Sequence, residues 1–344
     1  MRITTRMILR NYRTNLNDTL GGLENARRQV ETGKRVNKAY QDPSAASKGA
    51  VLEQRFSRNS DYLNSAKNAQ TWLDSQEDVL NQLNTISMKV HEDYAPSAIT
   101  DTSGEAGRQA YASTLRELAK SMINALNTKY GDSYVMAGSD GKKAPFEMLD
   151  DGTVLYRGVD VSASETIVDA DGNVQENPDF KLLQQYAKDA TYIDLGFGLE
   201  FKDGAVIPST AFNTALPGVA ATGYGTNDEG ISNNLMVMMN EMATLLEDPN
   251  FDKGQFEKIW MNFKEKSGEL QDHFTNIGAK GQLLTATIDK LEVEKLNIEE
   301  SYADTLGIDS AEAITEYSYA NYVYNAALKV GTSILTPSLL DFMK

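Results

Sequence analysis

Apolar side chains recur every three or four residues near both ends of this 344-residue chain. Such spacing is typical of helices that pack side by side in coiled coils. The first segment carries one repeat, made of Leu9, Tyr12, Leu16, Thr19, Leu23, Ala26 and Val30. The last segment carries two adjacent repeats, Ala313, Ala320, Val323, Ala327, Val330 and Ile334 beside Ile314, Tyr317, Tyr324, Leu328 and Leu335. We therefore predict one helix at each end of the chain, and we expect these two helices to lie side by side.

Part of these repeats forms what we call the assembly seam, the surface through which the terminal helices are expected to pair. It comprises Leu9, Tyr12, Leu16, Leu23, Val30, Ile314, Tyr317, Val323, Tyr324, Leu328 and Leu335. Ordering each residue costs about 1–2 kcal/mol of conformational entropy, and a lone helix pair buries too little apolar surface to offset this. We therefore expect both ends to be poorly ordered in a single copy and to fold when many copies pack together. The alternative is an ordinary bundle within one molecule.

A short break follows the first helix. It contains the turn motif Gly33, Lys34, Arg35, Val36 and Asn37, and then Asp42 and Pro43. Gly33 can adopt the left-handed conformation that ends helices. Asp42 is a good N-cap acceptor, and the ring of Pro43 suits the first helical position. We predict that one helix ends at Gly33 and the next begins at Pro43, with a hinge between them.

Longer repeats in the middle of the chain predict a helical body. One helix is expected from Pro43 to the low 90s, ended by Tyr94-Ala95-Pro96. A third helix is expected to have an apolar face made of Tyr111, Leu115, Leu118, Met122, Ala125 and Leu126. After Gly230 we expect one helix through Met242 and another from about Lys253, continuing past Gly278 and Gly281 towards Ile298. These long middle helices are expected to pack within the molecule.

The stretch between about 136 and 230 has a different character. Short β-prone runs alternate there with Asp151-Gly152, Asp171-Gly172 and Asp203-Gly204, which are typical of hairpin turns. A short helix is expected near 181–188. The predicted fold is thus mainly α, with an inserted β-containing domain and a long coiled-coil-like bundle formed by the N- and C-terminal segments. Three parts are expected: the terminal segments 1–42 and 300–344, a helical body of 43–145 and 231–299, and the insertion 146–230.

Charge is distributed unevenly along the chain. The formal net charge of −16 argues against binding to nucleic acid or to an anionic membrane surface. Residues 1–38 nevertheless hold nine Arg or Lys against three acids, whereas residues 289–316 hold nine acids against two lysines. Opposite charges favour pairing of the two ends, within a molecule or between neighbours. No stretch reaches the roughly 18 apolar residues of a membrane span.

Candidate catalytic and metal-binding groups are few. The chain has no cysteine, which excludes thiol catalysis and disulfides. His91 and His273 are its two histidines and are expected to be solvent-facing or capping residues. Asp169–Asn173 resembles part of a calcium loop but fits a hairpin turn better. The pairs Gly196/Gly198 and Gly223/Gly225 lack the further residues of a phosphate loop and are expected to be turns. A cluster comprising Met236, Met238, Met239 and Met242 is expected in a helix core, with an adaptable binding groove as the alternative. We predict no enzyme, cofactor or metal site.

Several motifs resemble the flagellin superfamily. In GKRVNKAYQDPSAAS, residues 33–47, the positions Gly33, Lys34, Arg35, Val36, Asn37, Asp42 and Pro43 match a Gly-Lys-Arg-hydrophobic-Asn turn followed by Asp-Pro. The residues between, 38–41, are bulkier and more polar than is usual there. YVMAGSDGKKAPFE at 134–147 and IGAKGQLL at 277–284 are similar to the superfamily as well. The opening MRIT and the ending SLLDFMK resemble its hook–filament junction branch better than flagellin.

This resemblance implies a structural subunit of the bacterial flagellum. Subunits of this kind are exported unfolded through the flagellar type III channel, without a cleaved signal peptide, and reach the outside of the cell. Paired terminal helices then line a tubular inner core. The implied partners are further copies in a ring, hook-associated protein 1 and flagellin as neighbours, and a cytoplasmic export chaperone on the C-terminal helix.

Two alternatives of different kinds stay open. The nearest is flagellin itself or a minor filament subunit, and the other is a soluble coiled-coil adaptor or export chaperone that never assembles. An enzyme is a third class, and no group of residues in the sequence favours it.

Overall fold

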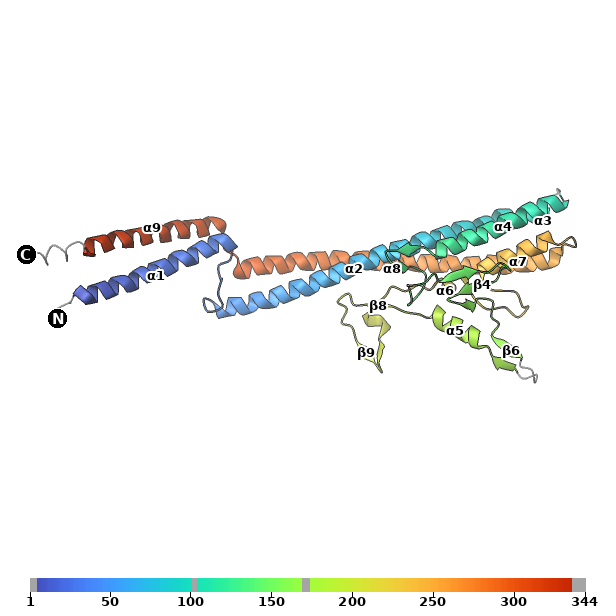
Figure 1. Cartoon of the computed structure of the whole chain (residues 1–344), viewed down its shortest axis with the longest axis horizontal. Helices are drawn as coiled ribbons and strands as arrows, with labels where there is room; N and C mark the ends of the chain where they lie inside the picture. Colours follow the sequence, from blue (N-terminus) through green and yellow to red (C-terminus); the bar gives the residue numbers. More distant parts are fainter. Residues whose placement is uncertain (1–4, 101–103, 169–173, 336–344) are drawn as a thin grey trace, which may run out of the picture. The chain divides into compact units, whose positions relative to one another are not determined.

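The structure is a computed structural model that describes residues 5–100, 104–168 and 174–335. Most of the described chain is helical, with short strands in its middle part (Figure 1). The chain divides into two compact units, residues 1–61 with 291–344, and residues 62–290. The first unit combines the two ends of the chain, whereas the second is one continuous segment. The predicted fold class, mainly α with a β-containing middle and pairing terminal helices, is confirmed.

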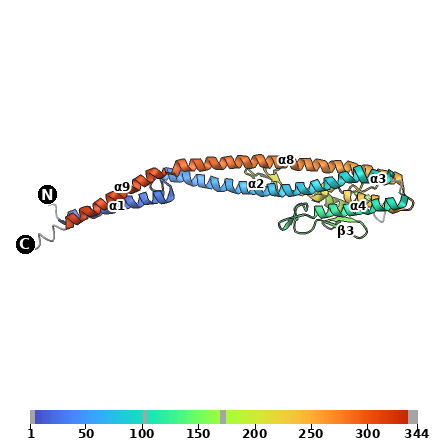
Figure 2. The same ribbon diagram turned by 90° about the horizontal axis from the view of Figure 1, so that it is seen from above.

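Helices α1 (Thr5–Thr32) and α9 (Ser310–Leu335) belong to the first unit and lie side by side (Figures 1 and 2). Helix α1 ends where predicted, because Gly33 has a φ of 65° and donates its N–H to Gln29 O at 2.9 Å. Helix α2 (Pro43–Lys89) begins where predicted, because Asp42 Oδ1 accepts the Ala45 N–H at 3.0 Å. These local signals therefore determined both ends of the break correctly.

The expected end of the second helix at Tyr94-Ala95-Pro96 is wrong. Helix α2 passes into a π-helical turn, Val90–Tyr94, and then into α3 (Ala95–Thr100). The Ala95 N–H donates to Val90 O, which closes the wider π turn. Pro96 is compatible with this path because residues in the first turn of a helix need no N–H partner. A π turn therefore accommodates the proline where the sequence suggested a stop.

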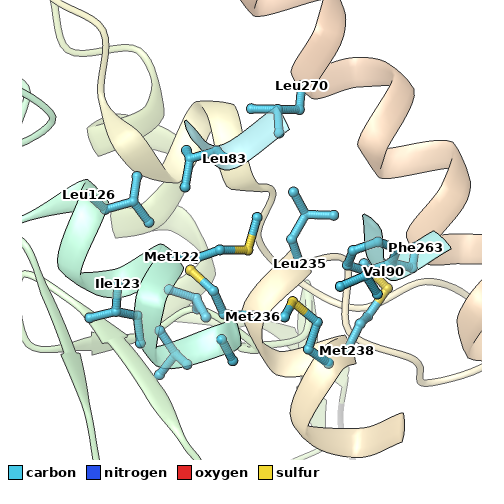
Figure 3. Packing of buried hydrophobic residues seen from close by; sticks show 14 of the residues in the cluster. Leu83, Val90, Met122, Ile123, Leu126, Leu235, Met236, Met238, Phe263 and Leu270 are labelled. Atoms are coloured by element: carbon cyan, nitrogen blue, oxygen red, sulfur yellow. The ribbon is translucent and has the colours of Figure 1, made fainter. Parts of the chain in front are cut away.

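The second unit contains α4 (Gly104–Leu126), α5 (Pro178–Ala187), α6 (Gly218–Thr222) and α7 (Leu235–Glu247). Helix α8 (Lys253–Leu306) is continuous past Gly278 and Gly281, as expected, and extends beyond Ile298. Side chains of α4, α7 and α8 point toward one another in Figure 3. Fully buried side chains of this core include Leu83, Leu115, Met122, Phe256 and Phe263. The methionines of α7 are buried with them, which confirms their predicted place in the core: Met236, Met238, Met239 and Met242.

The strands are short and pair antiparallel. They are β1 (Lys129–Tyr130), β2 (Ser133–Tyr134), β3 (Phe146–Met148), β4 (Val154–Tyr156), β5 (Val159–Asp160), β6 (Thr166–Val168), β7 (Val174–Glu176), β8 (Tyr192–Ile193), β9 (Phe201–Lys202), β10 (Ala205–Val206) and β11 (Phe212–Asn213). A three-stranded sheet has the order β3-β4-β5, and the two-stranded pairs are β1-β2, β6-β7, β8-β11 and β9-β10. A single 3₁₀ turn, Pro208–Thr210, precedes β11 among the described residues.

Two of the predicted Asp-Gly hairpin turns are confirmed. Gly152 has a φ of 89° between β3 and β4. Asp203 and Gly204, with φ of 54° and 82°, connect β9 to β10. Two successive residues with positive φ are typical of the tight turn that joins paired strands. The third pair, Asp171-Gly172, lies outside the described residues.

Candidate assembly surface

Helices α1 and α9 run antiparallel and approach each other closely. Near the start of α1, Tyr12 donates its hydroxyl to Ala327 O near the end of α9, at 3.1 Å. A Cβ added to Gly331 would overlap the Tyr12 phenol, so the ring packs directly over the glycine backbone. Alanines follow on the same side of α9, at Ala320 and Ala313. Small residues on α9 therefore let the backbones of the two helices come together.

The assembly seam is only partly covered within one chain. Tyr12, Leu16 and Leu23 of α1 are half-buried, and so are Tyr317, Val323 and Tyr324 of α9. Full burial in this pair is reached at Ala26 and Ala313, which are 6% and 2% exposed. The remaining seam residues are exposed: Leu9 (38%), Val30 (41%), Ile314 (55%) and Leu328 (40%). The side chain of Leu335 lies outside the described part of the structure.

The inner side of α9 combines members of both sequence repeats. Ala313 and Ala320 come from one repeat and Tyr317 and Tyr324 from the other, and together they face α1. Apolar side chains flank this inner side and remain in solvent, at Ile314 and Leu328 and at Tyr319, Tyr322 and Val330. A helix whose apolar surface exceeds what one neighbour covers is suited to additional neighbours.

The turn motif is attached to the segment that joins α8 to α9. Arg35 N–H donates to Leu306 O at 2.7 Å, and Ile308 N–H donates to Gly33 O at 3.2 Å. These bonds flank an antiparallel bridge between Lys34 and Gly307. The chain therefore passes the predicted hinge twice, once at residues 33–35 and once at 306–308, and these two segments are hydrogen-bonded to each other.

Side chains of the motif stabilise the same turn. Asn37 Nδ2 donates to Lys34 O at 2.9 Å, and Thr32 Oγ1 donates to Asn37 Oδ1 at 2.8 Å. The Arg35 guanidinium lies 3.6 Å from Asp42 Oδ2. That carboxylate also caps α2, and its hydrogen bond to the Ala45 N–H is the main cause of its lowered pKa. Each polar residue of the motif thus has a structural role.

A chain of polar contacts connects the turn to both long helices. Lys34 Nζ donates to Tyr302 Oη at 2.6 Å, and Tyr302 Oη donates to Glu53 Oε1 at 2.6 Å. Lys34 Nζ also lies 3.7 Å from Glu53 Oε1. The hydrogen bond to Tyr302 is the main cause of the raised pKa of Lys34. Sequence reasoning found Lys34 but missed Tyr302 and Glu53, because no local pattern connects them to the motif.

A small apolar cluster lies beneath the turn. Val36, Ala45 and Leu306 are 7%, 7% and 6% exposed and pack together. Any Cβ on Gly49 would overlap the Leu306 side chain, so α8 lies directly against the backbone of α2 there. Gly307 and the cap Asp309, which accepts the Ala311 N–H at 2.7 Å, mark the start of α9. A glycine followed closely by Asp is the sequence signal that could have predicted this break between α8 and α9.

Basic residues of the N-terminal segment find several of their partners close by. Arg27 pairs with Glu31 and Arg28 with Glu24, both within α1. Arg35 reaches the C-terminal half of the chain through the carbonyl of Thr305, at 3.4 Å, rather than through an acid. These three arginines therefore contribute little to the charge attraction expected between the two ends of one chain.

The two histidines lie in helical segments of the second unit. His91 and His273 are half-buried, which is less exposed than the solvent-facing position that was one of the two roles expected of them. The ring of His91 lies 3.3 Å from Ser87 O, and burial is the main cause of the lowered pKa of His273. Both residues belong to helical segments that pack in the second unit, which explains their burial. Among the described residues no group of three or more His, Cys, Asp or Glu could hold a metal ion.

The remaining sequence candidates are loops. Gly196, Gly198, Gly223 and Gly225 all have φ between 79° and 84°, which confirms them as turn residues. Asp169–Asn173, the partial calcium loop, lies outside the described residues. Within the described ranges no helix is long and apolar enough to cross a bilayer.

Comparisons with known proteins agree with the resemblance seen in the turn motif. Residues 3–140 match the family of the bacterial flagellin N-terminal helical region. Flagellar hook-associated protein 3 of Salmonella typhimurium is 27% identical over 168 residues, 48% of this chain and 52% of that protein. The Escherichia coli protein of the same name is 24% identical over 257 residues, 72% of this chain and 81% of that protein. The match thus spans about half of the first relative and most of the second.

A solved structure supports the fold. It is described as that of a flagellar hook-associated protein from Vibrio parahaemolyticus, and it is 15% identical with a TM-score of 0.55. The similarity extends over 78% of this chain and 100% of the other chain. The expected resemblance to the flagellin superfamily, and to hook-associated protein 3 within it, is confirmed.

Proposed function

We propose that this relative of flagellar hook-associated protein 3 is a structural subunit of the bacterial flagellum that forms the junction between hook and filament. The observation that carries the proposal is the α1–α9 pair, whose apolar surface is only partly covered within one chain. Leu9, Ile314 and Leu328 remain 38–55% exposed on helices that otherwise pair through heptad-spaced residues. Burying such side chains against further copies releases about 25 cal/mol for each Å² of apolar surface.

The proposal includes a way of assembly. The chain leaves the cell unfolded through the flagellar export channel, with a cytoplasmic chaperone on α9 until export. Outside the cell, the terminal segments 1–42 and 300–344 pair with those of neighbouring copies in a ring. Hook-associated protein 1 and flagellin are the neighbours on the two sides. The parts 43–145 with 231–299, and 146–230, are the body and the outer domain of this subunit.

The nearest alternative is flagellin or a minor filament subunit, whose copies would assemble along the whole filament. The names of the matched relatives favour the junction. The distinction lies in the place of assembly, because both kinds of subunit are expected to use paired terminal helices.

Imaging tests the proposal directly. In cells that lack this protein, we expect hooks without filaments and flagellin shed into the medium. In complemented cells, immunogold against the chain should label one position at the end of the hook. Labelling along the filament would favour the flagellin alternative. Labelling confined to the cytoplasm, with normal filaments in the deletion strain, would overturn the proposal.

A further inference from the structure

A groove of about 430 Å³ runs between α2 and α8 in the first unit. Its lining is formed by Leu52, Glu53 and Phe56 of α2 and by Ile298, Glu299 and Tyr302 of α8. The four apolar and aromatic side chains form the lining between two carboxylates, one contributed by each helix. A partner that fits this groove must therefore present apolar side chains together with a positive charge.

Two lysines of the same chain lie over aromatic rings of the groove, so its lining is compatible with cations. Lys34 Nζ lies 5.2 Å from the centre of the Tyr302 ring, and Lys295 Nζ lies 5.5 Å from the centre of the Phe56 ring. Cations are attracted to the faces of aromatic rings at such distances. Glu53 is already engaged by the Tyr302 hydroxyl and Lys34. Among the cationic groups of the described residues, none forms an ion pair with Glu299. Glu299 is exposed and is therefore the acid available to a new partner.

Helix α1 carries the complementary chemistry. Leu9 and Arg13 are four residues apart and thus lie on the same side of the helix. Leu9 is 38% exposed, and Leu20 on the same side is 45% exposed. Arg13 is exposed and, within the described part of the chain, takes part in no ion pair. Helix α9 also exposes apolar residues, but the acids Glu312 and Glu316 in its first turns would be repelled by Glu299.

We propose that this groove receives the N-terminal half of α1 from a second copy of the chain, with Leu9 against the half-buried Leu52 and Phe56 and with Arg13 paired to Glu299. The proposal rests on the proposed function, because it concerns copies that assemble side by side. It assigns the exposed side of Leu9, a residue of the assembly seam, to α2 and α8 of a neighbouring copy rather than to another terminal helix. In that contact the basic N-terminal segment of one copy binds the acidic α8 of the next.

Cysteine cross-linking tests this contact, because the chain has no cysteine of its own. Cells would co-produce two single variants, Arg13→Cys and Glu299→Cys, and isolated flagella would be oxidised and analysed without reductant. Each variant then carries a single cysteine, so a disulfide-linked dimer of the two variants is formed only between different copies of the chain. Glu300→Cys is the matched control, since Glu300 is also exposed on α8 but lies about 100° further around the helix. We expect a dimer yield about tenfold higher for Glu299→Cys than for Glu300→Cys.

A charge exchange gives an independent readout. Arg13→Glu and Glu299→Arg should each lower the amount of chain per isolated flagellum about tenfold, and the double variant should restore it. Both residues are exposed, and circular dichroism of the purified variants would verify their folding.

The outcomes separate this inference from the function on which it rests. If the chain is present at the hook end but Glu299→Cys and Glu300→Cys cross-link equally, the groove contact is refuted and the junction function stands. The groove contact is also refuted, and the junction function again stands, if the double charge exchange fails to restore assembly or if the Glu299→Cys chain cross-links to a different protein instead. If the unmodified chain is absent from isolated flagella, both proposals fail.

Discussion

The terminal helix pair and the core of the second unit follow the same apolar spacing but reach different burial. In the second unit, Leu115, Met122 and Phe263 are 0% exposed. In the α1–α9 pair, Leu9, Ile314 and Leu328 are 38–55% exposed. The number of neighbours explains the difference. Side chains of α2, α4, α7 and α8 contribute to the core, whereas in the described part of the chain α1 and α9 are covered chiefly by each other. A heptad pattern therefore specifies a packing surface without specifying whether one molecule completes it.

Limited proteolysis should show the largest difference between the two regions. We expect a protease of broad specificity to remove about 40 residues from each end of the purified monomer and to leave the rest intact, because exposed helices with few buried contacts open most easily. Mass spectrometry of the digest identifies the cut sites, which we expect near the turn 33–42 and near Gly307. Full resistance of both ends would contradict the idea that the terminal helices α1 and α9 need assembly in order to fold.

Phe263→Ala should produce the next largest effect. The ring of Phe263 is fully buried, and truncation of such a side chain costs about 3–5 kcal/mol in the free energy of unfolding. Urea denaturation of the monomer measures this loss. Met261→Ala is the control on the same helix, since Met261 is 69% exposed and should change stability by about 0.5 kcal/mol or less. Equal losses would mean that the core is not the main source of monomer stability.

Leu16→Asp should separate the stability of the monomer from assembly. Leu16 is half-buried against a single neighbouring helix, so we expect the free energy of unfolding to change by less than about 1 kcal/mol. Incorporation at the hook end should be abolished, because the completed seam would bury an unpaired carboxylate. Asn17→Asp places the same charge at an exposed position one residue away and should assemble normally. If Leu16→Asp lowers the free energy of unfolding of the monomer as well as incorporation, α1 is part of the folded core of the monomer.

The polar contacts of Lys34 should give the smallest effect. The pKa of Lys34 is raised, chiefly by its hydrogen bond to Tyr302, so its contribution is fully present below the unfolded value near 10.5. That contribution is lost as pH rises through the raised pKa of the folded state. The stability difference between the native chain and Lys34→Met should thus be under about 1 kcal/mol at pH 8 and should shrink towards pH 12. Lys48→Met, at an exposed lysine of α2, is the control; the same pH dependence in both variants would contradict this role of Lys34.

Local signals in the sequence predicted the helix boundaries at the break. Gly33 and the Asp42-Pro43 pair act through their own backbone angles and through hydrogen bonds to residues a few positions away. The π turn at Val90–Tyr94 was not predicted, because its presence depends on how the chain continues past Pro96 rather than on one residue type. Turn residues likewise predicted the hairpins, and two of them are confirmed.

The candidate surface was predictable in composition but not in contacts. Heptad spacing divided the apolar residues of α9 into two repeats. The side of α9 that faces α1, however, combines Ala313 from one repeat with Tyr317 from the other. The side of α9 that packs against α1 is the one where small side chains let the two backbones approach most closely. Which side that is depends on the shape of α1 as well as on the sequence of α9. Lys34 and Tyr302 are 268 positions apart, so their contact is visible only once the chain has folded.

The hydrogen-bonded segments Gly33–Lys34 and Gly307–Ile308, which join the terminal helices to α2 and α8, have a mechanical consequence. A single linker swivels about its φ and ψ bonds, whereas two strands bridged by backbone hydrogen bonds cannot rotate about each other without separating. They can still bend together, as a ribbon does. Such a connection would transmit a twist of the α1–α9 pair to the adjoining ends of α2 and α8 while still allowing it to bend.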